Sequence, residues 1–313
     1  MNATILLGDA RERLADVEAG SVRTCVTSPP YWGLRDYGHD GQLGLESTPD
    51  EYVARMVDVF RAVRRTLADD GTLWLNLGDS YATGAGKVGH HPGGGAQGAS
   101  WKGATTSPNR LPIEGLKPKD LVGIPWRVAF ALQADGWWLR QDIIWHKPNP
   151  MPESVTDRCT KSHEYVFLLS KSARYFYDAD AVAEPLVIGA GAKRNISPAH
   201  KGAASTRNDG DRTGVVNDGT RNKRSVWTVA TQPFKGAHFA VMPTALAEPC
   251  VLAGSALGDL VLDPFTGSGT VGVVALRHGR RFVGVELNPE YAEIAQDRIE
   301  GDQPMFNTVQ VAS

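Results

Sequence analysis

The sequence predicts an α/β fold built on a mostly parallel β-sheet with an antiparallel edge strand. Two strand–helix–strand patterns support this prediction, one over residues 4–28 and one over residues 260–286. Such units place their strands parallel in one sheet, with helices packed on its faces. Residues 138–145 and 164–169 also have strand character, but no helical pattern joins them. Because no helix connects them, these two strands are expected to form an antiparallel pair at one edge of the sheet.

The composition is that of an ordinary globular protein of 313 residues, with 42% hydrophobic and 22% charged residues. The net charge of −2 gives no overall basicity that would point to a nucleic-acid partner. The three cysteines stand far apart without metal-ligand spacing, so we expect neither a disulfide nor a metal site. The chain has no membrane-spanning apolar run and its start does not resemble a signal peptide. We therefore expect a cytoplasmic protein.

The first half of the chain continues the alternation of helices and strands. Residues 48–51 (TPDE) combine a capping hydroxyl, a first-turn proline and a glutamate, which predicts the start of a helix ending near Leu67. Residues 71–78 then alternate as a strand. Residues 83–118 are rich in glycine and predict a long mobile loop. A helix is expected over 119–136, with a kink or a later start at Pro125.

The turn at residues 27–32 (TSPPYW) follows the second expected strand. Two consecutive prolines end the strand, because they lack N–H groups and fix φ. Their carbonyls become rigid hydrogen-bond acceptors, with a hydroxyl on one side and two aromatic rings on the other. This arrangement suits a flat heterocycle that carries an exocyclic amine. An ordinary strand-ending turn capped by surface aromatics is the alternative.

Residues 185–235 form a second break in composition. Within 193–235, nine Lys and Arg residues stand against three acidic residues, although the whole chain is slightly acidic. Glycine and small polar residues fill the rest, and Trp227 and Phe234 lie near the end. Such a segment can follow a phosphate backbone and contact base edges. A solvated insertion without a partner is the other interpretation.

The C-terminal third carries a glycine-rich turn after a buried strand. Gly267, Gly269 and Gly272 have GxGxxG spacing, and Glu286 ends the next strand. Glycines let a ligand approach the backbone, and an acid at that place accepts both hydroxyls of a ribose. Asp263 would repel a pyrophosphate but attract an amino group. A ligand with a ribose, an adenine and an amino-acid tail is S-adenosylmethionine. Asn288 and Pro289 are expected to begin the last helix.

Three segments together resemble the amino-methylating DNA methyltransferases: residues 263–270 (DPFTGSGT), 284–289 (GVELNP) and 27–32 (TSPPYW). The catalytic motif precedes the cofactor motif, an order that resembles the β class of that family. The resemblance covers nearly the whole chain except 83–118 and 185–235. It implies a Rossmann-like, circularly permuted, seven-stranded sheet and S-adenosylmethionine as cofactor. The expected units are a catalytic half (1–184), a basic target-recognition segment (185–235) and a cofactor-binding half (236–313).

The resemblance also implies roles for individual residues. The catalytic group comprises Ser28, Pro29, Pro30 and Tyr31, and the cofactor group comprises Asp9, Asp263, Phe265, Gly267, Ser268, Gly269, Thr270 and Glu286. In that assignment Asp263 holds the methionine amino group, Glu286 the ribose and Asp9 lies near the adenine. Adjacent strands are expected to bring Glu286 and Asp9 together.

The implied reaction is methyl transfer to an exocyclic amine of a base that has left double-stranded DNA. The Pro29 carbonyl and the Ser28 hydroxyl are expected to accept the amine hydrogens, and Tyr31 to stack on the base. A serine before the prolines favours N4 of cytosine, with N6 of adenine as the alternative. Methylation at C5 is excluded because Cys250 lacks the required Pro-Cys-Gln setting.

Two functions of other classes use part of the same pattern. A nicotinamide-dependent dehydrogenase would use the glycines and Glu286, but it leaves the Pro-Pro-Tyr turn and the basic segment unexplained. A catalytically inactive DNA-binding protein would keep the fold without turnover. The sequence leaves open the DNA recognition sequence, and also whether the chain forms a homodimer or acts beside a cognate restriction endonuclease.

Overall fold

A nine-stranded β-sheet organises the chain. The computed structural model describes residues 2–34, 39, 41–82, 113–185, 219–232, 241–305 and 307–312. The strands, in their order across the sheet, are β11 (Thr308–Ala312), β1 (Asn2–Leu7), β10 (Arg281–Glu286), β9 (Leu260–Asp263), β2 (Val22–Thr27), β3 (Leu67–Leu77), β5 (His163–Ser170), β4 (Trp138–His146) and β8 (Val226–Thr228).

The seven central strands confirm the predicted permuted methyltransferase sheet. The last strand–helix–strand unit lies beside the first, because β10 pairs in parallel with both β9 and β1. Strand β2 then pairs in parallel with β9, so the two ends of the chain share one sheet. The antiparallel strand is β5, which pairs with β3 and β4. Strands β4 and β5 thus form the expected antiparallel pair at one edge of the seven central strands. Strand β5 itself lies one place inside that edge, because β4 and then β8 follow it in the sheet.

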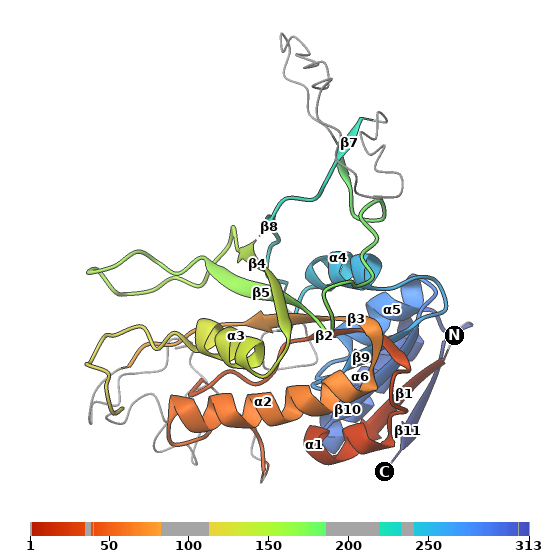
Figure 1. Cartoon of the computed structure of the whole chain (residues 1–313), viewed down its shortest axis with the longest axis horizontal. Coiled ribbons are helices and arrows are strands. Elements are labelled where there is room, and N and C mark those ends of the chain that lie inside the picture. Colours follow the sequence, from red (N-terminus) through yellow and green to blue (C-terminus); the bar gives the residue numbers. More distant parts are fainter. Residues whose placement is uncertain are drawn as a thin grey trace, which may run out of the picture.

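Helices cover both faces of the sheet (Figure 1). One face is covered by α1 (Ala10–Arg13), η1 (Leu14–Asp16), α2 (Pro49–Thr66) and α3 (Ile124–Ala134), and the other by α4 (Thr244–Gly254), α5 (Thr270–Arg277) and α6 (Pro289–Asp302). Each face has its own apolar core, and side chains such as Phe60 and Leu276 are fully buried. Burial of this apolar surface is the main force that fixes the layers.

The helix starts follow the capping signals in the sequence. The Thr48 hydroxyl accepts a hydrogen bond from the Glu51 amide at the start of α2, and the Asn288 side chain caps α6 by accepting one from the Glu290 amide. Helix α3 begins at Ile124, later than residue 119, because Pro125 occupies its first turn and Gly123 before it is left-handed. Of the two options at Pro125, the later start is therefore confirmed.

Both sheet edges carry a strand that the sequence patterns did not predict. Strand β11 pairs with β1, and β8, from the basic segment, pairs with β4. A two-stranded arm of β6 (Glu184–Pro185) and β7 (Thr220–Arg221) projects from the body (Figure 1). The expected loop lies outside the described residues over 83–112, as does the basic segment over 186–218 and 233–235. No helix in the described part of the chain is long and apolar enough to cross a membrane.

Candidate active site

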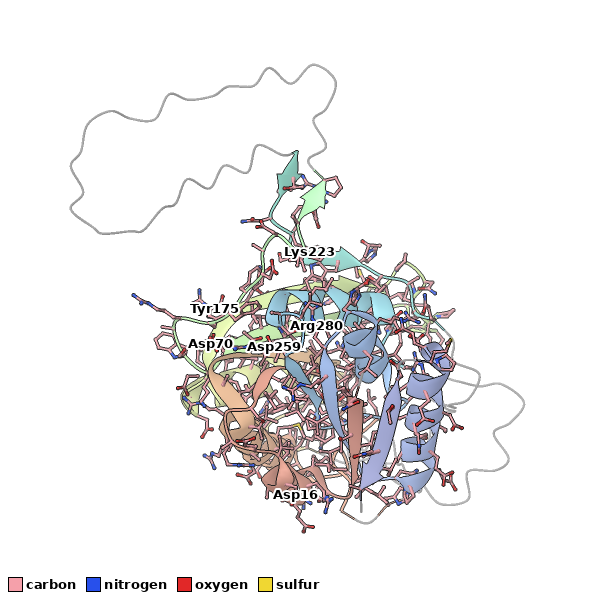
Figure 2. The ribbon with its side chains drawn as sticks, turned by 90° about the vertical axis from the view of Figure 1, so that its right-hand side faces the viewer. Asp16, Asp70, Tyr175, Lys223, Asp259 and Arg280 are labelled. Atoms are coloured by element: carbon pink, nitrogen blue, oxygen red, sulfur yellow. The ribbon has the colours of Figure 1, made fainter. Side chains whose placement is uncertain are left out.

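A cavity of about 780 Å³ lies at the carboxyl ends of the parallel strands, where open α/β sheets bind ligands. Its wall contains eleven of the twelve residues expected at the site: Asp9, Ser28, Pro29, Pro30, Tyr31, Asp263, Phe265, Gly267, Ser268, Thr270 and Glu286. Both expected groups therefore face one space, although they lie near opposite ends of the chain. The opposite end of β2 carries Arg23, which pairs with Asp70 and Asp259; these two aspartates are labelled in Figure 2.

Gly269 is the one expected residue that does not line the cavity. It has a left-handed φ of 76° at the start of α5, and an added Cβ would lie 3.1 Å from the Cα of Ala295 in α6. Its requirement for glycine thus comes from the close packing of two helices. The contact of Gly269 with the cofactor stays a prediction, and its place in the GxGxxG spacing is also explained by the helix contact.

Asp263 joins the two halves of the site. Its Oδ1 accepts a hydrogen bond of 2.6 Å from the Thr27 hydroxyl and one of 3.0 Å from the Phe265 amide. Thr27 ends β2 and Asp263 ends β9, so the pairing of these strands sets the contact. Burial raises the pKa of Asp263 to about 7, with a further contribution from the nearby charge of Glu286. Within the described residues no cation pairs with Asp263, which leaves its carboxylate suited to a positively charged ligand.

Glu286 is held at the end of β10 by the backbone. Its carboxylate accepts hydrogen bonds from the amide of Gly267 at 2.7 Å and the amide of Asn288 at 2.9 Å. Its burial raises the pKa of this carboxyl group. Each oxygen keeps a lone pair for a ligand hydroxyl. Strand pairing places Glu286 opposite Leu7, two residues before Asp9, which confirms that their strand ends are adjacent.

Asp9 has a structural role that the sequence patterns did not reveal. It caps α1 by accepting a hydrogen bond from the Arg11 amide at 2.8 Å, and it forms an ion pair with the Arg11 guanidinium. The hydrogen bond from Arg11 lowers the pKa of Asp9. Asp9 thus carries a charge that Arg11 already neutralises, and its place in the cavity wall is next to the expected adenine region.

Hydrogen bonds within the protein hold the Pro-Pro turn in place. Tyr52 donates a hydrogen bond of 2.8 Å to the Pro30 carbonyl, and the Trp32 indole donates one of 2.9 Å to the Glu46 carbonyl. Trp32 is only 1% exposed and belongs to the core, so the turn presents one aromatic ring to the cavity and not two. None of the described residues donates to the carbonyl of Pro29, which is one of the two acceptors expected from the sequence.

Polar side chains from β3 and β5 contact the catalytic group, which directly follows β2. The Tyr31 hydroxyl donates to Glu164 at 2.8 Å and lies 3.1 Å from Asn76 Oδ1. The Ser28 hydroxyl donates to the same Asn76 oxygen at 3.2 Å. Glu164 also pairs with Lys147, whose ammonium lies 4.2 Å from the centre of the Trp145 ring.

Sequence reasoning missed Asn76, Glu164 and Lys147. The only available signal was a polar residue, Asn76, within the apolar run of residues 73–77. A buried amide in such a run needs hydrogen-bond partners, which indicates a polar site nearby. The partners themselves come from strands distant in sequence.

The end of the basic segment is fixed to the cavity rim. The Asn149 side chain exchanges two hydrogen bonds with the backbone of Thr231, at 3.0 and 3.2 Å, and the Trp145 indole donates to the Val229 carbonyl at 2.8 Å. Thr231 lines the cavity. Lys223 lies between the projecting arm and the main sheet (Figure 2), with its ammonium 5.1 Å from the centre of the Trp227 ring. Part of the basic segment therefore borders the site.

The described side chains contain no cluster of three His, Cys, Asp or Glu residues that could hold a metal ion. The cavity fits S-adenosylmethionine by its chemistry. Its buried carboxylate at Asp263 suits an amino group, and backbone-held Glu286 suits ribose hydroxyls. Its volume lies in the range of cavities that bind small molecules.

Comparisons with known proteins agree with this geometry. The model of the DNA methylase family matches residues 22–297. The chain is 48% identical to the Type II methyltransferase M.Cfr9I of Citrobacter freundii, over 99% of this chain and 91% of that protein. It is 50% identical to the Type II methyltransferase M.SmaI of Serratia marcescens, over 94% of this chain and 90% of that protein.

Solved structures show the same fold. The DNA methyltransferase PvuII, described as cytosine-N4-specific, has a TM-score of 0.63 at 18% identity, covering 99% of this chain and 95% of that one. A putative DNA modification methylase of Thermus thermophilus, in complex with S-adenosylmethionine, has a TM-score of 0.62 at 24% identity, covering 99% and 100%. The family match, the high identity over nearly the whole chain and the cavity together show that this protein belongs to the site-specific, S-adenosylmethionine-dependent Type II DNA amino-methyltransferases.

Proposed function

We propose that this enzyme methylates the exocyclic N4 amine of cytosine in double-stranded DNA. The observation that carries the proposal is Ser28, whose hydroxyl lies in the cavity wall directly before the two prolines. In this family a serine at that position usually accompanies N4-cytosine methylation. The fold of the cytosine-N4-specific PvuII enzyme is compatible with this assignment.

The cofactor group would hold the methyl donor from three sides. Asp263 binds its amino group, Glu286 its ribose hydroxyls, and Asp9 lies on the adenine side. Phe265 and the turn over 267–270 form the wall, and the left-handed φ of 52° at Gly267 favours a residue without a side chain, which lets the donor approach the backbone. When bound, the donor supplies a methyl group on a positively charged sulfur.

The catalytic group would position the target amine. The Pro29 carbonyl and the Ser28 oxygen accept its two hydrogens, which favours a pyramidal nitrogen with a free lone pair. That lone pair forms the new C–N bond as the bond between the methyl carbon and sulfur breaks, and solvent takes the released proton. No strong base is required, and positioning is the main contribution of the protein.

The base must leave the duplex to reach this site, at a cost of a few kcal/mol. Stacking on Tyr31 offsets part of this cost, with roughly 1–3 kcal/mol per base in comparable complexes. The basic segment 185–235, fixed at the cavity rim through Asn149 and Thr231, would contact the DNA around the target. The division into 1–184, 185–235 and 236–313 and a cytoplasmic location stay predictions. Whether the chain forms a homodimer or acts beside a cognate endonuclease stays open.

Analysis of modified nucleosides tests the choice of base. Purified protein and S-adenosylmethionine carrying a deuterated methyl group are incubated with amplified, unmethylated bacterial genomic DNA, and the digested nucleosides are separated by mass spectrometry. We expect labelled N4-methylcytosine and no labelled N6-methyladenine. Labelled N6-methyladenine alone would overturn the choice of base, in favour of the alternative, while keeping the enzyme class.

A fluorescence titration with each cofactor, together with the label-transfer assay, addresses the two other classes. Binding of NADH without binding of S-adenosylmethionine would favour the dehydrogenase, which the family match already disfavours. Binding of S-adenosylmethionine without label transfer to any DNA would favour an inactive DNA-binding protein. Heat-denatured protein is the control for label that adheres without reaction.

A further inference from the structure

A buried amide lies directly behind the catalytic serine. Asn76 is only 2% exposed, near the end of the apolar run of β3. Its Nδ2 donates to the Tyr165 carbonyl at 3.0 Å and to Glu164 Oε2 at 3.3 Å. A carbonyl and a carboxylate only accept hydrogen bonds, so the amide nitrogen must face them. The orientation of the amide is therefore determined, and its oxygen faces Ser28 and Tyr31.

The distances indicate which acceptor receives the proton of each hydroxyl group near the Asn76 oxygen. The Tyr31 hydroxyl is closer to the Glu164 carboxylate, at 2.8 Å, than to Asn76, at 3.1 Å. Hydrogen bonds to a charged acceptor are also the stronger ones, so the Tyr31 proton goes to Glu164. Burial and the charge of Glu164 raise the pKa of Tyr31 well above its ordinary value, which keeps this proton in place.

The oxygen of Asn76 is then available for the proton of Ser28. An amide oxygen cannot donate, so the contact of 3.2 Å requires the Ser28 hydroxyl to be the donor. The alternative acceptor for the Ser28 proton is the Tyr31 hydroxyl oxygen, at 3.3 Å. In both cases the proton of Ser28 is held by a protein acceptor, and the lone pairs of Ser28 remain for an incoming N–H group.

We propose that Asn76 is a positioning residue, which fixes the Ser28 hydroxyl as an acceptor for the target amine. This inference rests on the proposed function, because it assumes that the amine meets Ser28. A freely rotating hydroxyl would also donate to the amine nitrogen and occupy the lone pair that must attack. Asn76 removes that orientation before the base arrives.

The network is anchored at its far end. Glu164 accepts from Tyr31 and Asn76 with one oxygen, and its other oxygen pairs with Lys147. Both partners of this ion pair have side chains less than a fifth exposed. The chain of contacts runs from Lys147, directly after β4, through β5 and β3 to Ser28, directly after β2, with few freely rotating groups.

A double-mutant cycle tests the proposal. Asn76→Ala, Ser28→Ala and the double variant are compared with wild type in single-turnover methyl transfer to unmethylated genomic DNA, at saturating S-adenosylmethionine. The rate is normalised to the cofactor-binding stoichiometry of each preparation. We expect Asn76→Ala to lower the rate about tenfold or more, with a cofactor Kd within about twofold of wild type. In the Ser28→Ala background, adding Asn76→Ala should lower the single-turnover rate by less than about twofold.

Asn307→Ala is the matched control. Asn307 is also buried and donates to one backbone carbonyl, that of Ile299, far from the catalytic group. This variant should lose thermal stability but keep the wild-type rate per bound cofactor. If Asn76→Ala does not fold, Glu164→Gln replaces it. That change removes the charged acceptor of Tyr31, so that Tyr31 competes with Ser28 for Asn76, and the same coupling is expected.

The possible results show whether the positioning role of Asn76 or the proposed function itself is wrong. A wild-type rate for Asn76→Ala, or losses that multiply fully in the double variant, would refute the positioning role while leaving the methyltransferase assignment intact. Methylation of adenine in place of cytosine would change the base but still allow the coupling to be measured. Absence of transfer by the wild-type protein would refute the proposed function itself.

Discussion

The two sides of the cavity hold their polar groups by different means. On the cofactor side, Asp263 and Glu286 accept hydrogen bonds mainly from backbone amides within a few residues or on the adjacent strand. On the target side, Ser28 and Tyr31 are fixed by side chains from other strands, namely Asn76 and Glu164. The first arrangement is local, and the second depends on the assembled sheet.

We infer that this difference separates cofactor binding from turnover. The backbone holds the cofactor carboxylates whatever the side chains of β3 and β5 are, so changes on the target side should leave cofactor affinity intact. Thr27 is the side chain that directly links the two sides among the described residues, through its 2.6 Å hydrogen bond to Asp263. The predictions below test this separation, from the largest expected effect to the smallest.

Tyr31→Ala should have the largest effect, a loss of about 100-fold in single-turnover rate. The change removes both the stacking surface and the hydroxyl that occupies Glu164. Cofactor affinity, measured by calorimetry, should stay within about twofold of wild type. A comparable loss of cofactor affinity would show that the ring belongs to the cofactor side.

Asp263→Asn should weaken cofactor binding by about tenfold or more, because it removes the charge that faces the amino group. It should also stabilise the free protein at about pH 8.5. The pKa of Asp263 is about 7 in the folded protein, above its ordinary value, so ionisation at higher pH costs stability. The asparagine keeps an acceptor for Thr27. Thermal unfolding without ligand should show a higher Tm, and a lower Tm would contradict the assigned burial penalty.

The cofactor affinity of wild-type protein should depend on pH through the same group. The raised pKa of about 7 means that Asp263 takes up a proton as pH falls below 7, and it then loses its attraction for an amino group. Affinity should therefore fall by about tenfold per pH unit below 7 and level off above it. Calorimetry between about pH 5.5 and 8.5 measures this profile. Asp263→Asn should give a flat profile, and an unchanged slope in that variant would assign the dependence to another group.

Gly78→Ala should have the smallest effect, a loss of roughly five- to tenfold in single-turnover rate. An added Cβ would lie 2.5 Å from Cε2 of Tyr31, so the ring must move away from its partners. Gly301→Ala is the control, since its Cβ would meet nothing within 4 Å and it lies in helix α6. That control should keep the wild-type rate. Equal rates for both variants would mean that the placement of the Tyr31 ring is not critical.

The same contrast explains what the sequence could predict. The cofactor side lies in contiguous motifs, so Asp263, Glu286 and the glycine turn were found with their strand ends, and the order of the central strands followed. Gly269 could not be separated from the ligand-contact glycines, because helix packing and ligand contact both require glycine. Trp32 was misassigned because the sequence does not show which aromatic ring is buried.

The target side could be predicted only in part. Ser28 and the prolines are contiguous, but Asn76, Lys147 and Glu164 approach them only through the pairing of β3, β5 and β4. No spacing along the chain encodes that meeting. The edge strands β8 and β11 were not predicted for a related reason, since each is short and depends on its neighbour in the sheet for hydrogen bonds.

A crossed measurement on Ser28→Ala and Asp263→Asn tests the central claim most directly. Cofactor Kd and the single-turnover rate at saturating cofactor are determined for both variants and for wild type. We predict that Ser28→Ala loses rate and keeps affinity, and that Asp263→Asn loses affinity and recovers most of the rate once saturated. If both variants lose affinity and rate together, the two sides of the cavity do not act separately and the account is wrong.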